Sequence, residues 1–185
     1  MRRLLVLGAV LAAAAVLVAV VEAPRVRRGQ DAVTGPRLFK MSGPDVTLVE
    51  IAIGPRRVRA ERAGDGWSVG GAPASPQARD AVTDLVDTLV ALRALDRFRP
   101  ADGASFGLEP PRATITLASA RRRTEVRLGE LNAARSAVYA RRDDGPHVML
   151  VGLYVVAALE RVVYFASRDL EGDAAPRDDQ RPEMG

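Results

Sequence analysis

The chain opens with an apolar run from Leu4 to Val21 that contains no charged side chain. A helix needs about 20 apolar residues to cross the hydrocarbon core of a bilayer, and there its backbone must satisfy its own hydrogen bonds. Glu22 breaks the run and Pro24 ends it. The pattern therefore predicts one transmembrane helix within residues 1–23, through which the protein contacts the membrane.

Two properties of this segment concern its processing and its orientation. A signal peptidase site needs small residues before the cut, and Val21 and Ala23 offer one, but Pro24 would follow the cut and disfavour cleavage. We therefore expect an uncleaved signal-anchor. Two arginines precede the apolar run and three follow it closely, so the positive-inside rule slightly favours a cytoplasmic C-terminal domain. A short basic start before an apolar run instead resembles an export signal, and charge alone leaves the orientation open.

Residues 24–45 are rich in Pro, Gly and Arg and lack apolar periodicity, which predicts a linker. An alternation of apolar and polar residues follows, with Val49, Ile51 and Ile53 on one face. The turn Gly64-Asp65-Gly66 is typical of a hairpin. The expected strands are 46–53, 57–62 and 67–69. Together they predict a three-stranded antiparallel meander.

A helical period replaces this alternation after residue 74. Ser75 is a favoured N-cap residue, and Pro76 suits the first helical position. The apolar residues that follow recur at the spacing of one helix face, which predicts an amphipathic helix. They are Ala78, Val82, Leu85, Val86, Leu89 and Leu92.

Three carboxylates, Asp80, Asp84 and Asp87, fall on the opposite face of this helix. Acidic residues in such a row could in principle bind a cation. No histidine or further acid converges on them in the sequence, however, and charged residues usually occupy exposed helix faces. We interpret the row as a solvated helix face.

The second half of the chain repeats the strand pattern. An extended stretch over 95–98 leads into a turn region over 102–111, where Gly107, Pro110 and Pro111 restrict the backbone. The next expected strands are 113–117, 124–128 (ended by Gly129), 137–141 and 147–151. A short apolar helix over 153–162 follows.

The predicted fold class is therefore α+β. Two small antiparallel meanders enclose one amphipathic helix and are followed by a short C-terminal helix, and one transmembrane helix precedes them. A single domain is expected over 46–170. Residues 171–185 are polar and charged without an apolar pattern, which predicts a disordered tail.

Composition narrows the classes of function. The chain has no cysteine, which excludes disulfides, thiolate nucleophiles and cysteine-bound metals. Its 185 residues carry a formal net charge of +4, with Lys40 as the only lysine among many arginines. A basic balance suits nucleic acid or anionic lipid. The strong preference for Arg, Ala, Gly and Pro is also what a GC-rich genome produces, and with only 4% aromatic residues we expect no nucleic-acid partner.

No group of residues in the sequence predicts catalysis or metal binding. His147 is the only histidine, so a single chain can build neither a Ser-His-Asp triad nor a histidine pair on a metal. The candidate nucleophiles Ser105, Ser119 and Ser136 have no base nearby in sequence, and Gly64-Asp65-Gly66 is too short for a calcium loop. We assign no catalytic, cofactor-binding or metal-binding residue, and expect no cofactor and no enzymatic activity.

Two aromatic residues are expected in the interior. Trp67 is the only tryptophan in an aromatic-poor chain and is predicted to be the largest side chain of the core, rather than an exposed anchor for a partner. Tyr139, in the strand over 137–141, is expected to pack between a hairpin and a helix.

The order of these signals resembles the bacterial domain-of-unknown-function family 4340. In that family a DGW turn, a yGLdxP segment, an iG strand end and a YvR…vylv hairpin follow one another. The matching segments here are Gly66-Trp67-Ser68-Val69, Phe106-Gly107-Leu108-Glu109-Pro110-Pro111, Arg127-Leu128-Gly129, Val138-Tyr139-Ala140-Arg141 and Val148-Met149-Leu150-Val151. The resemblance covers about residues 46–170.

The resemblance implies an α+β domain behind a single membrane helix of the inner membrane, facing the periplasm. It also implies an accessory or scaffold subunit, bound to a protein partner, in an ABC-type transport or envelope complex of the kind linked to gliding motility. Longer members carry the unit more than once, whereas this sequence fits one copy. Two alternatives remain: a basic domain that binds anionic lipid or another polyanion, and, less favoured, a hydrolase with acids or serines around a pocket.

Overall fold

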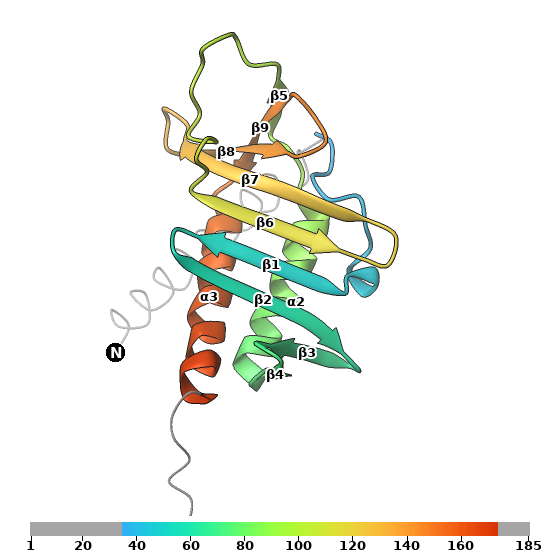
Figure 1. The fold of residues 1–185 in the computed structure, drawn as a ribbon. Coiled ribbons are helices and arrows are strands. Elements are labelled where there is room, and N and C mark those ends of the chain that lie inside the picture. The colour runs from blue at the N-terminus through green and yellow to red at the C-terminus, as the bar shows by residue number, and fades with distance from the viewer. Residues whose placement is uncertain (1–34, 174–185) are drawn as a thin grey trace, which may run out of the picture. The chain divides into compact units, whose positions relative to one another are not determined.

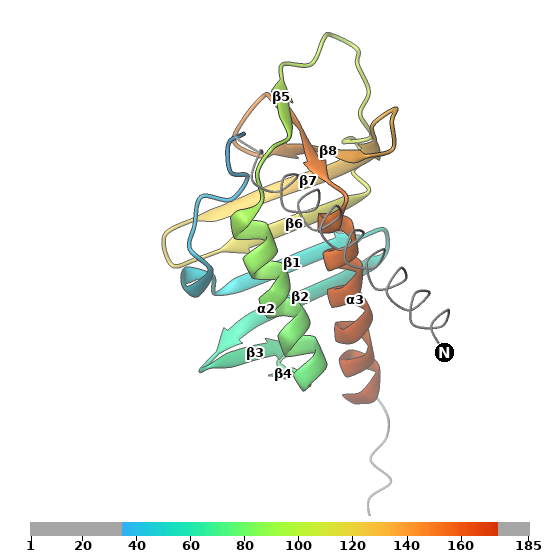
Figure 2. The same cartoon turned by 180° about the vertical axis from the view of Figure 1, so that it is seen from behind.

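The structure, a computed structural model, describes residues 35–173 and consists there of one antiparallel sheet with two helices on one of its faces (Figures 1 and 2). Among these residues the strands are Leu48–Ile53 (β1), Arg56–Ala63 (β2), Gly66–Val69 (β3), Ala72–Pro73 (β4), Asp96–Phe98 (β5), Ala113–Ala118 (β6), Arg123–Leu131 (β7), Ala137–Arg142 (β8) and Val148–Gly152 (β9). The helices are Gly43–Asp45 (η1, a 3-10 helix), Pro76–Ala91 (α2) and Tyr154–Asp173 (α3).

The nine strands form one continuous sheet in the order β4-β3-β2-β1-β6-β7-β8-β9-β5. The α+β class is confirmed, but the expectation of two separate small meanders is wrong, because β1 pairs with β6 as well as with β2. A meander that ended at β1 would leave a row of unpaired backbone groups at its edge. The pairing of Ile51 with Ile115 satisfies that edge and joins the two halves of the chain.

The side of the sheet that carries the helices is apolar. Opposite residues on neighbouring antiparallel strands point to the same side, and one such row crosses four strands. It contains Val58, Ile51, Ile115 and Val126, all buried. The helices α2 and α3 pack against each other over this side.

The start of α2 lies where the sequence predicts it. Ser75 is its N-cap, and the Ser75 Oγ accepts a hydrogen bond of 3.2 Å from the backbone N–H of Ala78. Pro76 occupies the first turn, and the apolar face predicted for this helix is buried. Trp67 is also buried, with 3% of its surface exposed, which confirms its predicted place in the core.

Three element boundaries differ from the prediction. The C-terminal helix was expected over 153–162 but runs to Asp173, because the apolar face continues through Val163 and Ala166. Strand β7 passes through Gly129 and ends at Leu131, with an irregular register beside it. A two-residue strand, β4, lies in the expected loop after β3.

The described part of the predicted linker, residues 35–45, lies against the domain. Leu38 and Phe39 are fully buried, and the Leu38 N–H donates to the Leu92 carbonyl at 3.0 Å. The predicted membrane segment from Leu4 to Val21 and most of the charged tail lie outside the described residues. Between residues 35 and 173, no helix has both the length and the apolarity needed to cross a bilayer.

Candidate functional site: an arginine-rich sheet face

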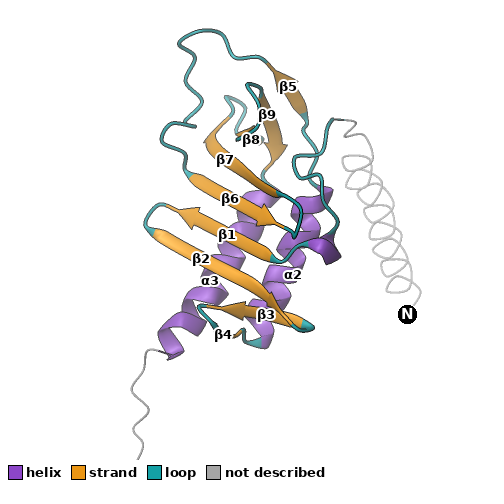
Figure 3. Ribbon diagram, turned by 45° about the vertical axis from the view of Figure 1, so that its right-hand side comes forward, coloured by secondary structure: helices purple, strands orange, loops and turns teal. Residues whose placement is uncertain are grey.

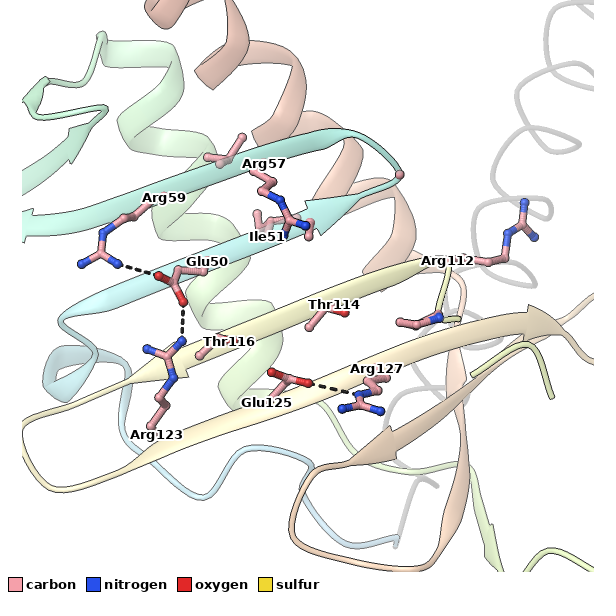
Figure 4. A pocket seen from close by; sticks show the side chains of 14 residues that line it. Glu50, Ile51, Arg57, Arg59, Arg112, Thr114, Thr116, Arg123, Glu125 and Arg127 are labelled. Carbon is pink, nitrogen blue, oxygen red and sulfur yellow. Dashed lines mark hydrogen bonds and ion pairs between the residues drawn. The ribbon is translucent and has the colours of Figure 1, made fainter. Parts of the chain in front are cut away.

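The face of the sheet opposite the helices carries a concavity of about 740 Å³ lined largely by charged side chains (Figure 4). Strand periodicity explains its composition. Because Val49 and Ile51 face the helices, Glu50 between them faces outward. The same alternation in β2, β6 and β7 turns further polar residues outward. The polar residues that line the concavity are Glu50, Arg57, Arg59, Arg112, Thr114, Thr116, Arg123, Glu125 and Arg127. We call this surface the arginine face.

Glu50 lies at the centre of the arginine face and binds two arginines. Its Oε1 accepts a hydrogen bond of 2.6 Å from the Arg59 Nη1, and its Oε2 accepts one of 2.5 Å from the Arg123 Nη2. Arg59 also pairs with Glu61. The hydrogen bond and the charge of Glu61, followed by the charge of Glu50, raise the pKa of Arg59 above its ordinary value. Arg59 therefore remains a cation at any physiological pH.

The arginine face has an excess of positive charge. Five arginines and two glutamates line it, a net formal charge of +3. Glu125 accepts a hydrogen bond of 3.1 Å from the Arg127 Nε. Arg57 and Arg112, by contrast, form no ion pair with any other residue between 35 and 173. The guanidinium group stays protonated at neutral pH. This arrangement is therefore suited to holding anions rather than to acting as an acid or a base.

A loop over residues 99–112 leads into β6, and its last residue, Arg112, lines the arginine face. Phe106 packs on Tyr139 with ring centroids 4.7 Å apart, and Phe98 lies 5.6 Å from Phe106. Tyr139 was expected between a hairpin and a helix, and this is wrong. Its neighbours Val138 and Ala140 take the helix-facing positions of β8, so Tyr139 points to the opposite side.

The three aspartates of α2 are exposed, as predicted. Asp84 pairs with Arg161 of α3 at 2.8 Å, and Asp80 with its neighbour Arg79 at 3.6 Å. Over residues 35–173 no group of three or more His, Cys, Asp or Glu side chains is placed to hold a metal ion.

The candidate nucleophiles are not brought together with a base. The Ser119 Oγ donates to the Arg122 carbonyl at 3.4 Å, and the Ser136 Oγ accepts from the Asn132 Nδ2 at 3.3 Å. Within the described part of the chain, none of the three serines hydrogen-bonds to His147, which contacts Arg97 instead.

The arginine face was not predicted from the sequence, although part of the pattern that indicates it is present there. Arginines at alternate positions of expected strands, such as Arg57 and Arg59, indicate a basic outward face. The sequence does not say that β1 and β6 are neighbours, and only that pairing brings Arg123 to Glu50 across 73 positions of the chain.

Residues 67–162, slightly more than half of the chain, match a protein family described as Domain of unknown function (DUF4340). The match runs from β3 into α3 and includes Arg112, Arg123 and Arg127, whereas Glu50 precedes it. Neither the curated proteins nor the solved structures contain a match to this chain.

Proposed function

The chain belongs to the DUF4340 family, and from this premise we propose that it is a non-catalytic accessory or scaffold subunit of a membrane-bound transport complex of the ABC type. In this proposal the segment from Leu4 to Val21 anchors the protein in the inner membrane and the folded domain lies on the periplasmic side. The arginine face docks an acidic segment of a partner protein. The excess of positive charge on that face is the observation that carries the proposal.

The arginine face is open to a partner because both helices lie on the other side of the sheet (Figures 1 and 2). Apart from Arg112, which directly precedes β6, its charged side chains come from β2, β1 and β7, and each of these strands is hydrogen-bonded to a neighbouring strand on both sides. The planar guanidinium group can engage a carboxylate through two parallel hydrogen bonds, so it loses less freedom per hydrogen bond than a lysine side chain does.

The ion pairs already present on this face can be exchanged at small cost. Arg59 and Arg123 each keep more than half of their side-chain surface exposed, and exposed ion pairs contribute only about 0–1 kcal/mol. A carboxylate of a partner can therefore replace Glu50 at either arginine. The unpaired Arg57 and Arg112 offer further contacts without any exchange.

A protein segment fits this face better than a lipid surface. Stable attachment to a bilayer surface combines basic residues with apolar side chains that enter the lipid. Among the described residues, the large exposed apolar side chains are Leu95, Leu153, Tyr154, Tyr164 and Leu170, and none of them lines the arginine face.

Photo-crosslinking in native membranes tests the proposal directly. A photo-crosslinking amino acid placed at Arg57 or Arg127 of the full-length protein should give a protein adduct of discrete mass that contains a subunit of the transport complex. The same amino acid at Asp80, on the helix side, serves as the control and should not give that adduct. An adduct from Asp80 alone, crosslinks to lipid alone, or a lone monomer after extraction in mild detergent would each contradict the proposal.

Binding to a synthetic acidic peptide measures the charge dependence. A peptide of ten glutamates should bind the detergent-solubilised full-length protein with an affinity that falls steeply as salt rises. The double variant Arg57→Gln/Arg127→Gln should weaken binding about tenfold, whereas Glu50→Gln should strengthen it severalfold because it releases two arginines. Equal affinities for Glu50→Gln and the wild-type protein would show that the peptide binds elsewhere.

A further inference from the structure

A second pocket, independent of the arginine face, is lined by residues of β5, β8 and β9 and of the turn between β8 and β9. Figure 3 shows these three strands at one end of the sheet. The pocket has a volume of about 300 Å³, at the lower end of the range for small-molecule sites. Three parts of the chain meet there: the segment before η1, strand β5, and the turn between β8 and β9. The charged and titratable residues that line it are Arg37, Lys40, Arg97, Arg142, Asp144 and His147. We call it the His147 pocket.

The His147 pocket holds four permanent cations and one carboxylate, a net charge of +3 with the imidazole neutral. Asp144 pairs with Arg142. Many other arginines of the domain form ion pairs. In the described range, no ion pair is formed by the three remaining cations of the pocket, which are Arg37, Lys40 and Arg97. The chain's only lysine and only histidine both lie in this pocket.

Arg142 lies at a position of β8 whose side chain points to the apolar, helix-covered side of the sheet. In the cross-strand row that contains Ile115 and Val126, the next partner is Arg142, so its side chain starts on the helix-covered side of the sheet. Only 13% of that side chain is exposed. Its Nη2 donates to Asp144, but its Nε is buried and meets no acceptor among residues 35–173. A buried charged donor without an acceptor is unfavourable, and an anion bound beside Arg142 would offset the charge of its guanidinium.

His147 is held as a neutral hydrogen-bond acceptor at the rim of the pocket. The Arg97 Nη2 lies 2.9 Å from the His147 Nδ1. Because arginine can only donate, Nδ1 must accept, and the ring proton is on Nε2. Partial removal from water, then the charges of Arg97 and Arg99, lower the pKa of His147 below its ordinary value.

From this geometry we propose that the His147 pocket binds a phosphate group, carried by a small soluble ester or by a phospholipid headgroup. Arg142, Arg97 and Lys40 supply the charge and the donors, and His147 adds its Nε2–H. A dianionic phosphate would offset two of the three surplus positive charges of the pocket, and the volume of about 300 Å³ suits a single phosphate group. Arginine and lysine are the side chains that proteins most often use to hold phosphate.

The single histidine allows a direct test by NMR. Full-length protein in a phosphate-free detergent is titrated with inorganic phosphate while the imidazole resonances of His147 are followed against pH. Phosphate should shift these resonances saturably and raise the pKa of His147 by about one unit, since a nearby opposite charge favours the imidazolium. Potassium chloride at matched ionic strength should produce neither effect. Equal responses to phosphate and chloride would overturn the proposal.

Three variants locate the binding site. Arg97→Gln and Lys40→Gln change exposed side chains, and each should weaken phosphate binding about tenfold. Arg142→Gln should do the same, provided that its circular dichroism shows a folded protein. Arg57→Gln, on the arginine face, is the matched control and should bind phosphate as the wild type does. Loss of binding in Arg57→Gln with retention in Arg97→Gln and Lys40→Gln would refute the site.

A last comparison identifies the source of the phosphate. Saturable binding of glycerol 3-phosphate, lost in Arg97→Gln, would support a soluble ester. A response of His147 to nanodiscs containing phosphatidic acid, but not to nanodiscs of phosphatidylcholine alone, would support a lipid headgroup. No response to either ligand would overturn the proposal, and it would leave the docking function of the arginine face unaffected.

Discussion

The backbone of Gly129 lies against the carbonyl oxygen of Phe106, so closely that a β-carbon on residue 129 would stand 2.1 Å from that oxygen. The next residue, Glu130, donates its backbone N–H to the same carbonyl at 2.8 Å. Gly107 takes a φ of 65°, a left-handed conformation that favours glycine, in the same contact. This contact fastens the loop over 99–112 to β7.

Substitution of Gly129 by alanine should destabilise the domain by about 1–3 kcal/mol, because the added methyl group meets backbone atoms that cannot move aside. Urea unfolding of the full-length protein, followed by the fluorescence of its single tryptophan, measures the change. Gly145→Ala is the matched control. A β-carbon at residue 145 meets no atom within 4 Å, so we expect a change below about 0.5 kcal/mol. Similar losses in both variants would refute the steric explanation.

Replacement of Trp67 by phenylalanine should lower the free energy of unfolding by about 1–3 kcal/mol. The indole is buried, its Nε1 donates to the Thr83 Oγ1 at 3.2 Å, and the Arg62 guanidinium lies 4.5 Å from the ring centroid. Thr83→Val removes the acceptor of the indole, together with the hydrogen bond of 2.9 Å that the Thr83 hydroxyl donates to the Arg79 carbonyl, and should lose about 1 kcal/mol.

The wild-type tryptophan fluorescence provides a check that needs no variant. Emission from a buried indole should be blue-shifted and quenched only weakly by acrylamide. Emission typical of a solvated indole would contradict the placement of Trp67.

The Ser75 cap should contribute about 1 kcal/mol to stability, so Ser75→Ala should lose that amount in urea unfolding. Ser75→Thr keeps the side-chain oxygen that accepts the capping hydrogen bond, so it should retain most of the contribution of the cap to stability. Ser42 is the control because it precedes η1 without a side-chain capping bond. If Ser42→Ala costs as much as Ser75→Ala, the loss does not arise from capping.

The pair formed by Glu109 and Arg141 should make stability depend on acid pH. The hydrogen bond and the charge of Arg141 lower the pKa of Glu109 below its ordinary 4.5. A carboxyl whose pKa is lower in the folded state stabilises the fold above pH 4.5, and this stabilisation is lost as the pH falls through the folded-state pKa.

Urea unfolding of Glu109→Gln measures this contribution. The variant should be slightly less stable than the wild type at pH 7, and the difference should shrink as the pH falls below 4.5. Arg141→Gln should remove the same pH-dependent part. The effect is small because 69% of the Glu109 side chain is exposed. A difference that stays constant from pH 7 to pH 2 would contradict the assignment.

Much of the architecture could be predicted because it depends on residues close in sequence. The alternation around Val49 and Ile51 identified a strand and its buried face, and Ser75-Pro76 marked the start of α2. The length of α3 was underestimated, since its buried apolar positions continue past Val162 through Val163 and Ala166.

The sites were harder to predict than the elements. No arginine of the arginine face or of the His147 pocket has sequence neighbours that mark it as part of a site. In a chain this rich in arginine, a functional cluster cannot be told from the general composition. Arg142 illustrates this: in the sequence it lies between the expected strand over 137–141 and a turn, and only its register opposite Val126 shows that it lies on the core side.

The sequence by itself determined most of the strands, the start and the buried face of α2, and that Trp67 is buried. These follow from periods of 2 and 3.6 residues, which are local properties of the chain. Only the tertiary structure decided that β1 lies beside β6, that Glu50 meets Arg123, and that Lys40 and His147 share a pocket. Such neighbours depend on satisfying strand edges and covering one face of the sheet, and both requirements act between segments that are distant in the chain.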